Sequence, residues 1–417
     1  MIELNSKQVE AFRYLRDREN VCITGPAGTG KSEIIKTFIS VYTNTRVIGV
    51  TSLTGVSALL INGTTIHSYL GIKLGKGTVN QLFQEIKRNT KAMRRWKTTD
   101  TLIIDEISMM SGELFTKLND IAKLVKKSAL PFGGIHLVLV GDFLQLPIIG
   151  KEQFCFKSEA WNECIPNTVY LTEIMRQREG NFQDCLNEIR LGYISENNRK
   201  ILDARVGLTP VNDHGIIPTK IFSHNIDVDR INNEELDKLA LDERQFVEYE
   251  MTCIGSKKHF RTVKMWCNAP AVLQLCTGAQ VMLLANLGTD SSTQFLCNGA
   301  RGVVIDFSIN MYPIVKFVNG YTMEISTIRY EYKDYRNIAL ARVEAIPLKV
   351  AYACSIHKMQ GSTLDCAEID VSKTFGPAMV YSALSRVRTL NGLFIIAIDY
   401  SQIEADPTAL EFYDSMK

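Results

Sequence analysis

The chain has 417 residues, of which 46% are hydrophobic and 22% are charged, and its formal net charge is +2. These values are typical of ordinary globular domains and exclude a low-complexity or fibrous chain. Because the charge is nearly balanced, any nucleic-acid site must be a local groove and not a uniformly basic surface.

The length predicts two or three domains, each with its own core. The first residues lack the basic start and apolar core of a signal peptide, and no apolar run reaches the length of a membrane span. The ten cysteines include no C-x-x-C pair, which argues against a zinc cluster or a thiol redox motif. We therefore expect a protein of a reducing intracellular compartment with no membrane partner.

The most specific motif lies at residues 25–32, whose sequence is Gly-Pro-Ala-Gly-Thr-Gly-Lys-Ser. An apolar strand predicted over Val21–Thr24 precedes it, and apolar residues recur at helical spacing behind it. The glycines let backbone N–H groups turn towards phosphates, and the start of the helix adds partial positive charge. In this motif Lys31 reaches the β- and γ-phosphates, and the Ser32 hydroxyl binds Mg²⁺. The sequence therefore predicts a nucleoside triphosphate site formed by Gly25, Pro26, Ala27, Gly28, Thr29, Gly30, Lys31 and Ser32.

Apolar strands alternate with helical segments through the first half of the chain, which predicts a parallel α/β sheet. The strand that ends at residue 105 is followed by a second acid, so that Asp105 and Glu106 stand together. Asp105 would complete the Mg²⁺ shell, and Glu106 would orient and deprotonate the attacking water. The further strands and the helix expected here are Val47–Thr51, Leu102–Asp105, His136–Gly141 and the helical Leu114–Val125.

Three further side chains are candidates for contact with a γ-phosphate. Gln145 follows the predicted strand at 136–141 and can hydrogen-bond this phosphate, although the same residues also fit a strand-end turn capped by Asp142. Arg176 and Arg386 compete for the role of a transition-state guanidinium, which is worth about 10³–10⁵ in rate. A surface salt bridge is the commoner role of an isolated arginine, so these two depend on their neighbourhood.

Residues 71–98 interrupt the α/β pattern with a basic run in which Glu85 is the one acidic residue. The run is either the solvated face of a helix or an inserted subdomain that contacts phosphates, and the sequence leaves both interpretations open. Its basic residues are Lys73, Lys76, Lys87, Arg88, Lys91, Arg94, Arg95 and Lys97.

Between about residues 252 and 345 the pattern changes to short β segments with turns. Apolar, β-branched runs occur at Val281–Leu284, Gly302–Ile305 and Tyr312–Val318. Asn298-Gly299 and Asn319-Gly320 are hairpin signals. This pattern predicts a small barrel inserted before the α/β pattern returns.

The order of these segments resembles that of superfamily 1B DNA helicases, and specifically the Pif-one-like (petite integration frequency) group. The resemblance covers essentially the whole chain, and the block at 131–147 is similar to this group in particular. The motifs that carry it are 4–8, 25–32, 50–55, 63–67, 105–106, 131–134, 141–147, 175–177, 278–281, 298–302, 355–364 and 383–386. The chain departs from the family pattern at Leu53, Leu144, Ile148 and Ser382, the last of which stands where the family usually has Val.

The resemblance implies an α/β fold of two RecA-like P-loop domains, with a small wedge insertion in the first and a β-rich, Src-homology-3-like insertion in the second. It places the first domain at 1–174 with the wedge at 71–98, the second at 175–252 and 346–417, and the β-rich insertion at 253–345. ATP and Mg²⁺ would lie between the two domains. The first domain would supply the phosphate loop and the acids, and the second would supply Arg176 and Arg386.

The resemblance also implies that Gln8 reads adenine and that the protein is a 5′→3′ DNA helicase. As a monomer, it would translocate on single-stranded DNA and unwind forked or tailed duplex DNA. A site that tracks the strand backbone needs donors and little base discrimination, which suits His357, although a buried structural histidine also fits there. The residues that would lie along the single strand are Thr51, Thr54, His67, His357, Lys358 and Gln360.

Other functions share part of this pattern. A translocase that hydrolyses ATP on single strands without separating a duplex has every one of these motifs and stays open. A P-loop kinase for a small molecule would leave Arg386 and the β-rich insertion without a role. An inactive binding module is disfavoured because the loop lysine, both acids and both arginines are present.

Overall fold

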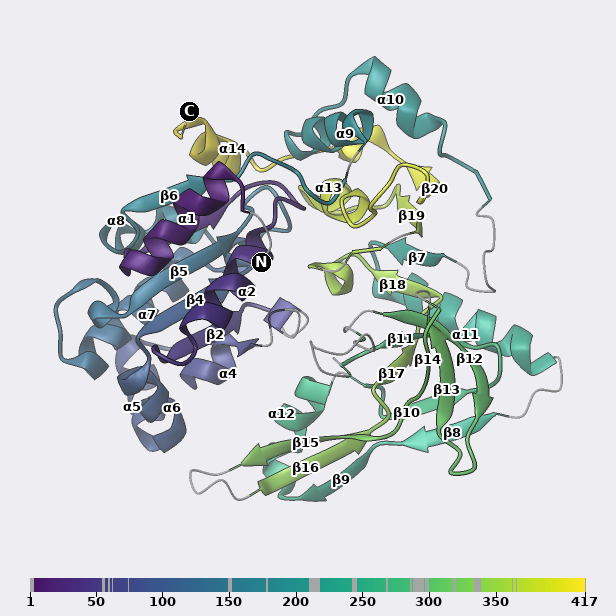
Figure 1. The fold of residues 1–417 in the computed structure, drawn as a ribbon, viewed down its shortest axis with the longest axis horizontal. Helices are drawn as coiled ribbons and strands as arrows, with labels where there is room; N and C mark the ends of the chain where they lie inside the picture. The colour runs from purple at the N-terminus through teal and green to yellow at the C-terminus, as the bar shows by residue number, and fades with distance from the viewer. Residues whose placement is uncertain are drawn as a thin grey trace. The chain divides into compact units, whose positions relative to one another are not determined.

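The computed structural model of the chain describes residues 4–416 except 55–56, 59–60, 62, 74, 149–151, 178, 210–217, 242–245, 268, 286, 288–295, 297–299, 318–319, 334–338, 362 and 365. At 225–226, 261–262, 265–266, 332–333 and 358 it describes the backbone alone. The chain forms two compact units: unit 1 comprises residues 1–204, 372–390 and 399–417, and unit 2 comprises 205–371 and 391–398. Figure 1 follows the chain through both units, from purple at the N-terminus to yellow at the C-terminus.

Unit 1 is built on a parallel sheet with the strand order β3-β2-β4-β5-β1-β6. Strands β1, β4 and β5 are buried along their whole length, as expected when helices cover both faces of a parallel sheet. The sheet confirms the predicted α/β core, and each of the four predicted strands lies within one residue of its observed bounds. The strands are β1 (Val21–Thr24), β2 (Ile48–Ser52), β3 (Thr64–Thr65), β4 (Thr101–Asp105), β5 (His136–Gly141) and β6 (Asn167–Tyr170).

Alternate residues of these strands face two separate cores, because successive side chains of a strand point to opposite faces. Val21, Val138 and Ile103 pack with α1 and α2 on one face, whereas Cys22 and Leu139 pack with α7 on the other. The helices of unit 1 are α1 (Ser6–Asp17), α2 (Lys31–Tyr42), α4 (Ile66–Leu70), α5 (Val79–Arg88), α6 (Thr90–Thr98), α7 (Gly112–Lys126), α8 (Glu159–Cys164), α9 (Gly180–Arg190), α10 (Glu196–Asp203), α13 (Met379–Leu384) and α14 (Pro407–Asp414). The short 3₁₀ turns are η1 (Ile107–Met109), η2 (Pro131–Gly134), η3 (Cys155–Lys157) and η5 (Tyr400–Gln402).

The C-terminal helix α14 packs against the sheet of unit 1, although these elements lie far apart in the sequence. The rings of Phe412 and Phe156 stack with their centroids 4.3 Å apart. The Tyr413 hydroxyl lies 2.6 Å from the hydroxyl of Thr24 at the end of β1. In Figure 1 the yellow α14 therefore lies close to the purple and blue elements that open the chain.

Unit 2 contains a parallel sheet with the strand order β18-β7-β19-β20, which helix α11 packs against. Its strands are β7 (Thr219–Phe222), β18 (Ala353–Ser355), β19 (Ala367–Val371) and β20 (Leu393–Ile398), with α11 at Asn225–Leu241 and a 3₁₀ turn η4 at His357–Met359. The rest of unit 2 is a β-rich region in which the strand pairs are antiparallel. A five-stranded sheet runs β14-β13-β12-β11-β17, a three-stranded sheet runs β15-β16-β9, and β10 pairs with β8.

The β-rich region confirms the predicted change of pattern and adds a helix that the sequence did not indicate. Helix α12 (Lys257–Cys267) packs Val263 against Ala341 and Val343 of β16. The hairpin signals at 298–299 and at Asn319 lie outside the described residues. The strands are β8 (Val247–Glu250), β9 (Thr252–Gly255), β10 (Val272–Leu275), β11 (Gln280–Leu283), β12 (Arg301–Phe307), β13 (Pro313–Phe317), β14 (Thr322–Glu324), β15 (Ile328–Lys333), β16 (Ala339–Ala345) and β17 (Leu348–Val350).

The predicted four-part division of the chain stays a prediction. The compact units place their boundaries elsewhere, because unit 1 extends through α10 and also takes in 372–390. Arg386 therefore shares a compact unit with the phosphate loop and the two acids. Within the described part of the chain, no helix combines the length and the hydropathy that crossing a bilayer requires.

Candidate nucleotide site and strand-binding residues

The loop at 25–32 has the backbone conformation of a phosphate cradle. Gly28 and Gly30 have φ values of 82° and 81°, in the left-handed region that favours glycine. A Cβ atom at Gly28 would lie 2.6 Å from Cβ of Arg176, and one at Gly30 would lie 2.5 Å from Nε2 of Gln8. Both positions therefore need glycine for conformation, and Gly28 needs it for space as well.

The side chain of Lys31 is held over this loop at the start of α2. Its ammonium donates hydrogen bonds to the carbonyl oxygens of Gly25 and Pro26, at 2.7 and 2.8 Å. Burial lowers the pKa of Lys31 to about 8, although nearby carboxylates oppose this shift. The next residue, Ser32, is exposed, so its hydroxyl is accessible to a metal ion.

Gln8 is buried against the loop. Its Nε2 donates to the carbonyl of Thr29 at 3.1 Å, and its Oε1 accepts from the Asn5 backbone N–H at 3.0 Å as part of the N-terminal cap of α1. This placement next to the nucleotide loop supports a role in binding the base. The predicted recognition of adenine stays a prediction.

Asp105 and Glu106 form a buried acidic pair at the end of β4. The Oδ1 of Asp105 accepts from the Glu106 backbone N–H at 2.9 Å. Burial and the neighbouring Glu106 raise the pKa of Asp105 above its ordinary value. Glu106 has a φ of 55°, a conformation that costs a non-glycine residue free energy and tends to occur at functional sites.

Arg176 and Arg386 lie together in unit 1. NH1 of Arg176 donates to the carbonyl of Ser385 at 2.9 Å, and the Arg176 backbone N–H donates to the carbonyl of Gly28 at 3.2 Å. Arg386 is 2% exposed, and its NH2 donates to Oε1 of Gln145 at 3.2 Å. Burial and the charge of Arg386 lower the pKa of Arg176 to about 9, and burial also lowers the pKa of Arg386. The structure thus brings the three predicted γ-phosphate residues into one neighbourhood.

The charges of this site are not balanced by its own side chains. Lys31, Arg176 and Arg386 form no ion pair with a described residue, and their hydrogen bonds go to neutral oxygens. The charge of Glu106 acts on all three and opposes part of the lowering of their pKa values that burial causes. Buried charges are normally paired or bound to metal. A triphosphate would pair with the cations and Mg²⁺ with the acids, so these residues fit both groups.

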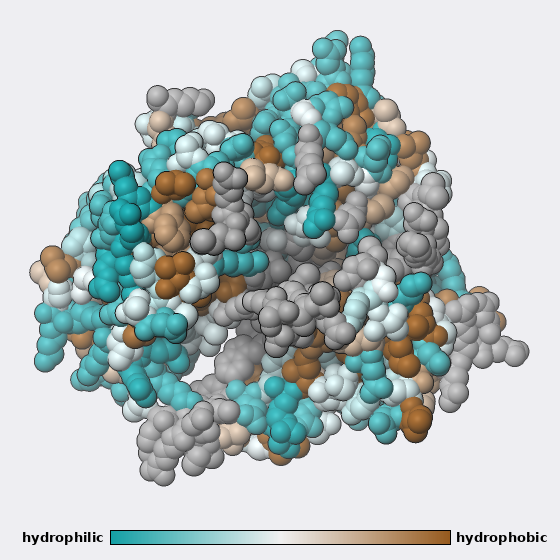
Figure 2. Space-filling model, viewed as in Figure 1, coloured by the Kyte–Doolittle hydropathy of each residue, from teal (hydrophilic) through white to brown (hydrophobic). Residues whose placement is uncertain are grey.

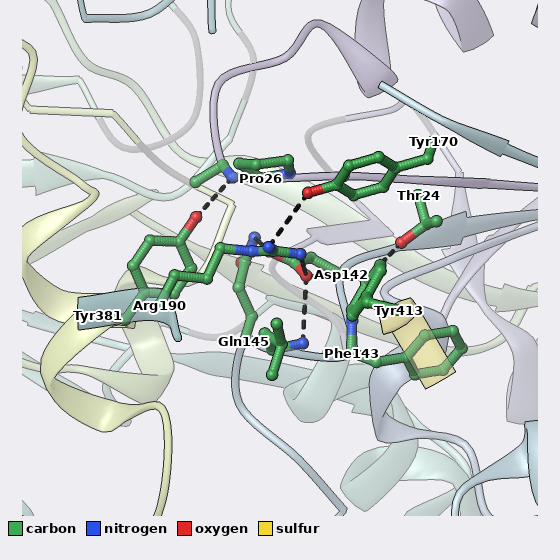
Figure 3. A network of polar contacts seen from close by, with 12 residues as sticks. Thr24, Pro26, Asp142, Phe143, Gln145, Tyr170, Arg190, Tyr381 and Tyr413 are labelled. Carbon is green, nitrogen blue, oxygen red and sulfur yellow. Dashed lines mark hydrogen bonds and ion pairs between the residues drawn. The ribbon is translucent and has the colours of Figure 1, made fainter. Parts of the chain in front are cut away.

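A second polar network, missed by the sequence reasoning, surrounds Asp142 behind the loop (Figure 3). Asp142 was considered only as the cap of a turn, but it is fully buried and forms a two-bond ion pair with Arg190, at 2.8 and 3.0 Å. Burial alone would raise the pKa of Asp142, but the charge and hydrogen bonds of Arg190 hold it below its ordinary value. Tyr381 joins the same region, because its hydroxyl accepts from the Ala27 backbone N–H at 2.8 Å. A buried Asp after a strand demands a partner, but no sequence pattern identifies which residue that partner is.

The predicted strand-binding residues of unit 1 differ in exposure. Thr51 is fully buried and its hydroxyl donates to the carbonyl of Ile103 at 2.6 Å, so its side chain offers nothing to a DNA strand. We therefore correct the prediction for Thr51, whose hydroxyl stabilises the sheet. Thr54 is partly exposed and bonds to Ser57 at 2.9 Å. His67 lies half-buried on α4, where burial lowers its pKa, so it is an uncharged donor at neutral pH.

The predicted strand-binding residues of unit 2 lie on and after η4. His357 is half-buried, and burial lowers its pKa as well. The side chain of Lys358 lies outside the described part of the structure. Gln360 is only 2% exposed, which leaves little of its side chain for a strand in this conformation. The roles of these three residues stay predictions.

The basic run at 71–98 forms two helices, α5 and α6, with strongly amphipathic sequences. Leu82, Ile86 and Trp96 are buried in the core of unit 1. The lower left of Figure 2, where Figure 1 places α5 and α6, is mostly hydrophilic. The exposed basic residues of the run include Lys76, Lys87, Arg88, Arg94 and Lys97.

One basic residue of the run has a structural role. Arg95 donates to the carbonyl of Tyr69, and its NH2 donates to the carbonyl of Ser68 at 2.9 Å. The indole N–H of Trp96 donates to the carbonyl of Leu70 at 2.9 Å. Helix α6 therefore satisfies the last carbonyls of α4, which have no partner within their own helix. Arg95 positions α4, and with it His67.

Two parts of the chain match known families. Residues 3–200 match the PIF1-like helicase family, and residues 259–307 match the 2B domain of the DNA helicase Pif1. The ATP-dependent DNA helicase PIF1 of Xenopus laevis is 37% identical over 100% of this chain and 65% of its own length. The ATP-dependent DNA helicase Pif1 of Bdellovibrio bacteriovorus is 33% identical over 99% of this chain and 92% of that protein. The chain thus spans 65% of the vertebrate relative and nearly all of the bacterial one.

Solved structures are similar over the same extent. The crystal structure of the Pif1 helicase from Candida albicans matches with a TM-score of 0.87 and 34% identity, over 100% of both chains. That of the Bacteroides Pif1 helicase in complex with ADP-AlF3 and ssDNA matches with a TM-score of 0.72 and 26% identity, over 100% of this chain and 97% of that one. These similarities confirm the predicted fold class, with RecA-like domains and a β-rich insertion.

Proposed function

The chain belongs to the PIF1-like helicase family, and from this premise we propose that it is an ATP-dependent DNA helicase that moves 5′→3′ along single-stranded DNA and separates tailed or forked duplexes. Membership in the family makes it an enzyme of the helicase class. The direction of movement, the translocation on one strand and a monomeric state are the parts that we propose. A reducing intracellular location belongs to the same proposal, supported by the free thiols of the nine described cysteines.

The observation that carries the proposal is the unbalanced charge of the nucleotide site. Lys31, Arg176 and Arg386 are cations without a carboxylate partner among the described residues, and the charge of Glu106 acts on all three. A transferring γ-phosphoryl group with its negative charge fits this arrangement. The relative with ADP-AlF3 and ssDNA supports the same chemistry for the family.

Each residue then has a role in hydrolysis. The backbone of the loop and Lys31 would hold the β- and γ-phosphates, and Ser32 with Asp105 would hold Mg²⁺, which would polarise those phosphates. Glu106 orients the attacking water and takes its proton. Arg176 and Arg386 stabilise the charge of the transition state, and Gln145 hydrogen-bonds the γ-phosphate.

For the single strand we propose contacts from Thr54 and His67 in unit 1 and from His357 and Lys358 in unit 2. These residues offer hydroxyl, imidazole and ammonium donors, which suit the sugar–phosphate backbone of any sequence. The buried Gln360 would join them only after a local rearrangement. We further propose that the exposed basic side chains of α5 and α6 meet the duplex as a wedge.

Strand displacement from two matched duplexes tests the proposal. Both carry the same sequence, one with a 5′ single-stranded tail and the other with a 3′ tail of equal length. We expect displacement of the 5′-tailed substrate alone, with ATP and Mg²⁺. Displacement from the 3′ tail would contradict the proposed direction, whereas DNA-stimulated ATP hydrolysis without any displacement would favour the translocase.

A further inference from the structure

The C-terminal helix α14 contributes a side chain to the region behind the nucleotide site that no motif of the family indicated. Tyr413 lies on this helix, is 7% exposed and reaches the ends of two central strands. Its hydroxyl has three partners: the Asp142 carboxylate at 2.9 Å, the Thr24 hydroxyl at 2.6 Å and the Phe143 backbone N–H at 3.0 Å.

The chemistry of these partners fixes the direction of every bond. A carboxylate can only accept, so the Tyr413 hydroxyl donates its one proton to Oδ1 of Asp142. It must then accept from the Phe143 N–H and from the Thr24 hydroxyl, which fills both of its lone pairs. Burial and the charge of Asp142 raise the pKa of Tyr413 well above its ordinary value, so the proton stays on the tyrosine at any physiological pH. The hydroxyl is thus fully satisfied in one orientation.

Asp142 connects Tyr413 by hydrogen bonds to two of the proposed γ-phosphate residues, Gln145 and Arg386. Its Oδ2 accepts from Nε2 of Gln145 at 3.4 Å, and Oε1 of Gln145 accepts from NH2 of Arg386 at 3.2 Å. A continuous chain of hydrogen bonds therefore runs from Thr24, next to the phosphate loop, through Tyr413, Asp142 and Gln145 to Arg386. Figure 3 shows most of this chain from close by, with Asp142 between Tyr413 and Gln145.

We propose that Tyr413 is a positioning residue for ATP hydrolysis, which orients Gln145 and Arg386 through Asp142. This inference rests on the proposed function, because it assumes that Gln145 and Arg386 act on the γ-phosphate. Without the Tyr413 bond, Oδ1 of Asp142 would keep two donors, Arg190 NH2 at 2.8 Å and the Leu144 backbone N–H at 3.1 Å, but would lose the donor that ties it to α14. The Arg190 ion pair would still hold the carboxylate, but its position relative to β1 and the turn after β5 would be less fixed, and with it the 3.4 Å bond to Gln145.

Tyr413→Phe tests the proposal, because it removes the hydroxyl and keeps the ring that lies 4.7 Å from the Arg190 guanidinium. Tyr170→Phe is the matched control: the Tyr170 hydroxyl accepts from NH1 of Arg190 at 3.3 Å and has no bond to Asp142. Both variants should be compared with the wild-type chain well below their unfolding temperatures, with single-stranded DNA present. The measurements are kcat and KM for ATP, and the binding of ADP alone and of ADP with aluminium fluoride, which mimics the transferring phosphoryl group.

We expect Tyr413→Phe to lower kcat by about tenfold, the rate equivalent of one hydrogen bond to a charged group, and to leave KM almost unchanged. It should weaken the binding of ADP–aluminium fluoride by a similar factor and leave the binding of ADP alone unchanged. Tyr170→Phe should behave as the wild type. A merely structural role would instead lower thermal stability without separating the two ligands.

Three outcomes would overturn the inference: an unchanged kcat in Tyr413→Phe, an equal loss in both variants, or an equal weakening of both ligands. If the wild-type chain itself neither hydrolyses ATP nor prefers ADP–aluminium fluoride to ADP, the proposed function fails and the inference fails with it. The wild-type arm therefore distinguishes the two kinds of failure.

Discussion

The nucleotide site and the basic helices α5 and α6 both gather positive charge in unit 1, but in opposite environments. In the nucleotide site, Arg386 is buried and Lys31 and Arg176 are partly buried, burial lowers their pKa values, and their bonds go to neutral oxygens. On α5 and α6 most cations are exposed, and Glu85 of α5 already pairs with Lys73, which precedes this helix, at 2.6 Å. Only the enclosed charges demand a counter-charge at a fixed place. Burial, and not the number of basic residues, therefore indicates where a specific anion binds.

The largest effect is expected from the enclosed lysine. Lys31→Ala should reduce ATP hydrolysis by at least about 10³-fold, because the phosphate contact that it provides acts in the transition state. Lys36→Ala, an exposed lysine of the same helix, serves as the control and should have no effect. Steady-state ATPase rates with saturating single-stranded DNA measure both. Equal rates in the two variants would remove the distinction between enclosed and exposed cations.

Arg386→Gln should lower kcat by about 10³-fold, because a guanidinium on the γ-phosphate contributes on the order of 10³–10⁵. Glutamine keeps hydrogen-bond donors but carries no charge. Binding of ADP, measured by calorimetry, should stay unchanged, since ADP has no γ-phosphate. A large loss of ADP affinity would show that Arg386 supports the fold of the site and not the transition state.

Glu106→Gln should retain ATP binding and lose hydrolysis by about 10²–10⁴-fold, because the shape stays and the base is lost. Trapping of labelled ATP on the variant, followed by its rate of hydrolysis in a single turnover, measures the two steps separately. Hydrolysis at the wild-type rate would assign the base to another residue.

On the exposed side of the comparison, Arg94→Ala combined with Lys97→Ala should slow strand displacement several-fold and leave single-strand-stimulated ATP hydrolysis unchanged. The reason is that stepping needs only the nucleotide site and the strand contacts. Arg95 is left intact because it holds the end of α4. If neither activity changes, the basic face of α5 and α6 is simply solvated.

The smallest effect concerns the salt dependence of single-strand binding. Lys358→Ala should reduce the slope of log K against log salt by ~0.7, the value for one phosphate contact. His67→Ala should weaken binding without changing the slope, because burial lowers the pKa of His67 and leaves it uncharged at neutral pH. An unchanged slope for Lys358→Ala would remove this residue from the strand contacts.

The sequence predicted the parallel strands and the phosphate loop because each depends on local pattern. Strand β5 at His136–Gly141, for example, is an apolar run followed by a turn, and its bounds agree with the prediction. Local pattern could not identify the partners of the buried Asp142. Arg190 and Tyr413 are 48 and 271 residues from Asp142, and only the folded chain brings them together. The resemblance implies a DNA contact for Thr51, because motif order does not reveal that its hydroxyl donates to the carbonyl of Ile103 within the sheet.

The contact between α6 and α4 also bears on how this protein can be engineered. Deleting residues 71–98 would expose the carbonyls of Ser68, Tyr69 and Leu70 that Arg95 and Trp96 now satisfy. The basic helices are therefore not an independent structural unit, and they cannot be deleted or exchanged between relatives at their sequence boundaries. A transplanted insert would function in a new host only if helix α4 were moved together with it.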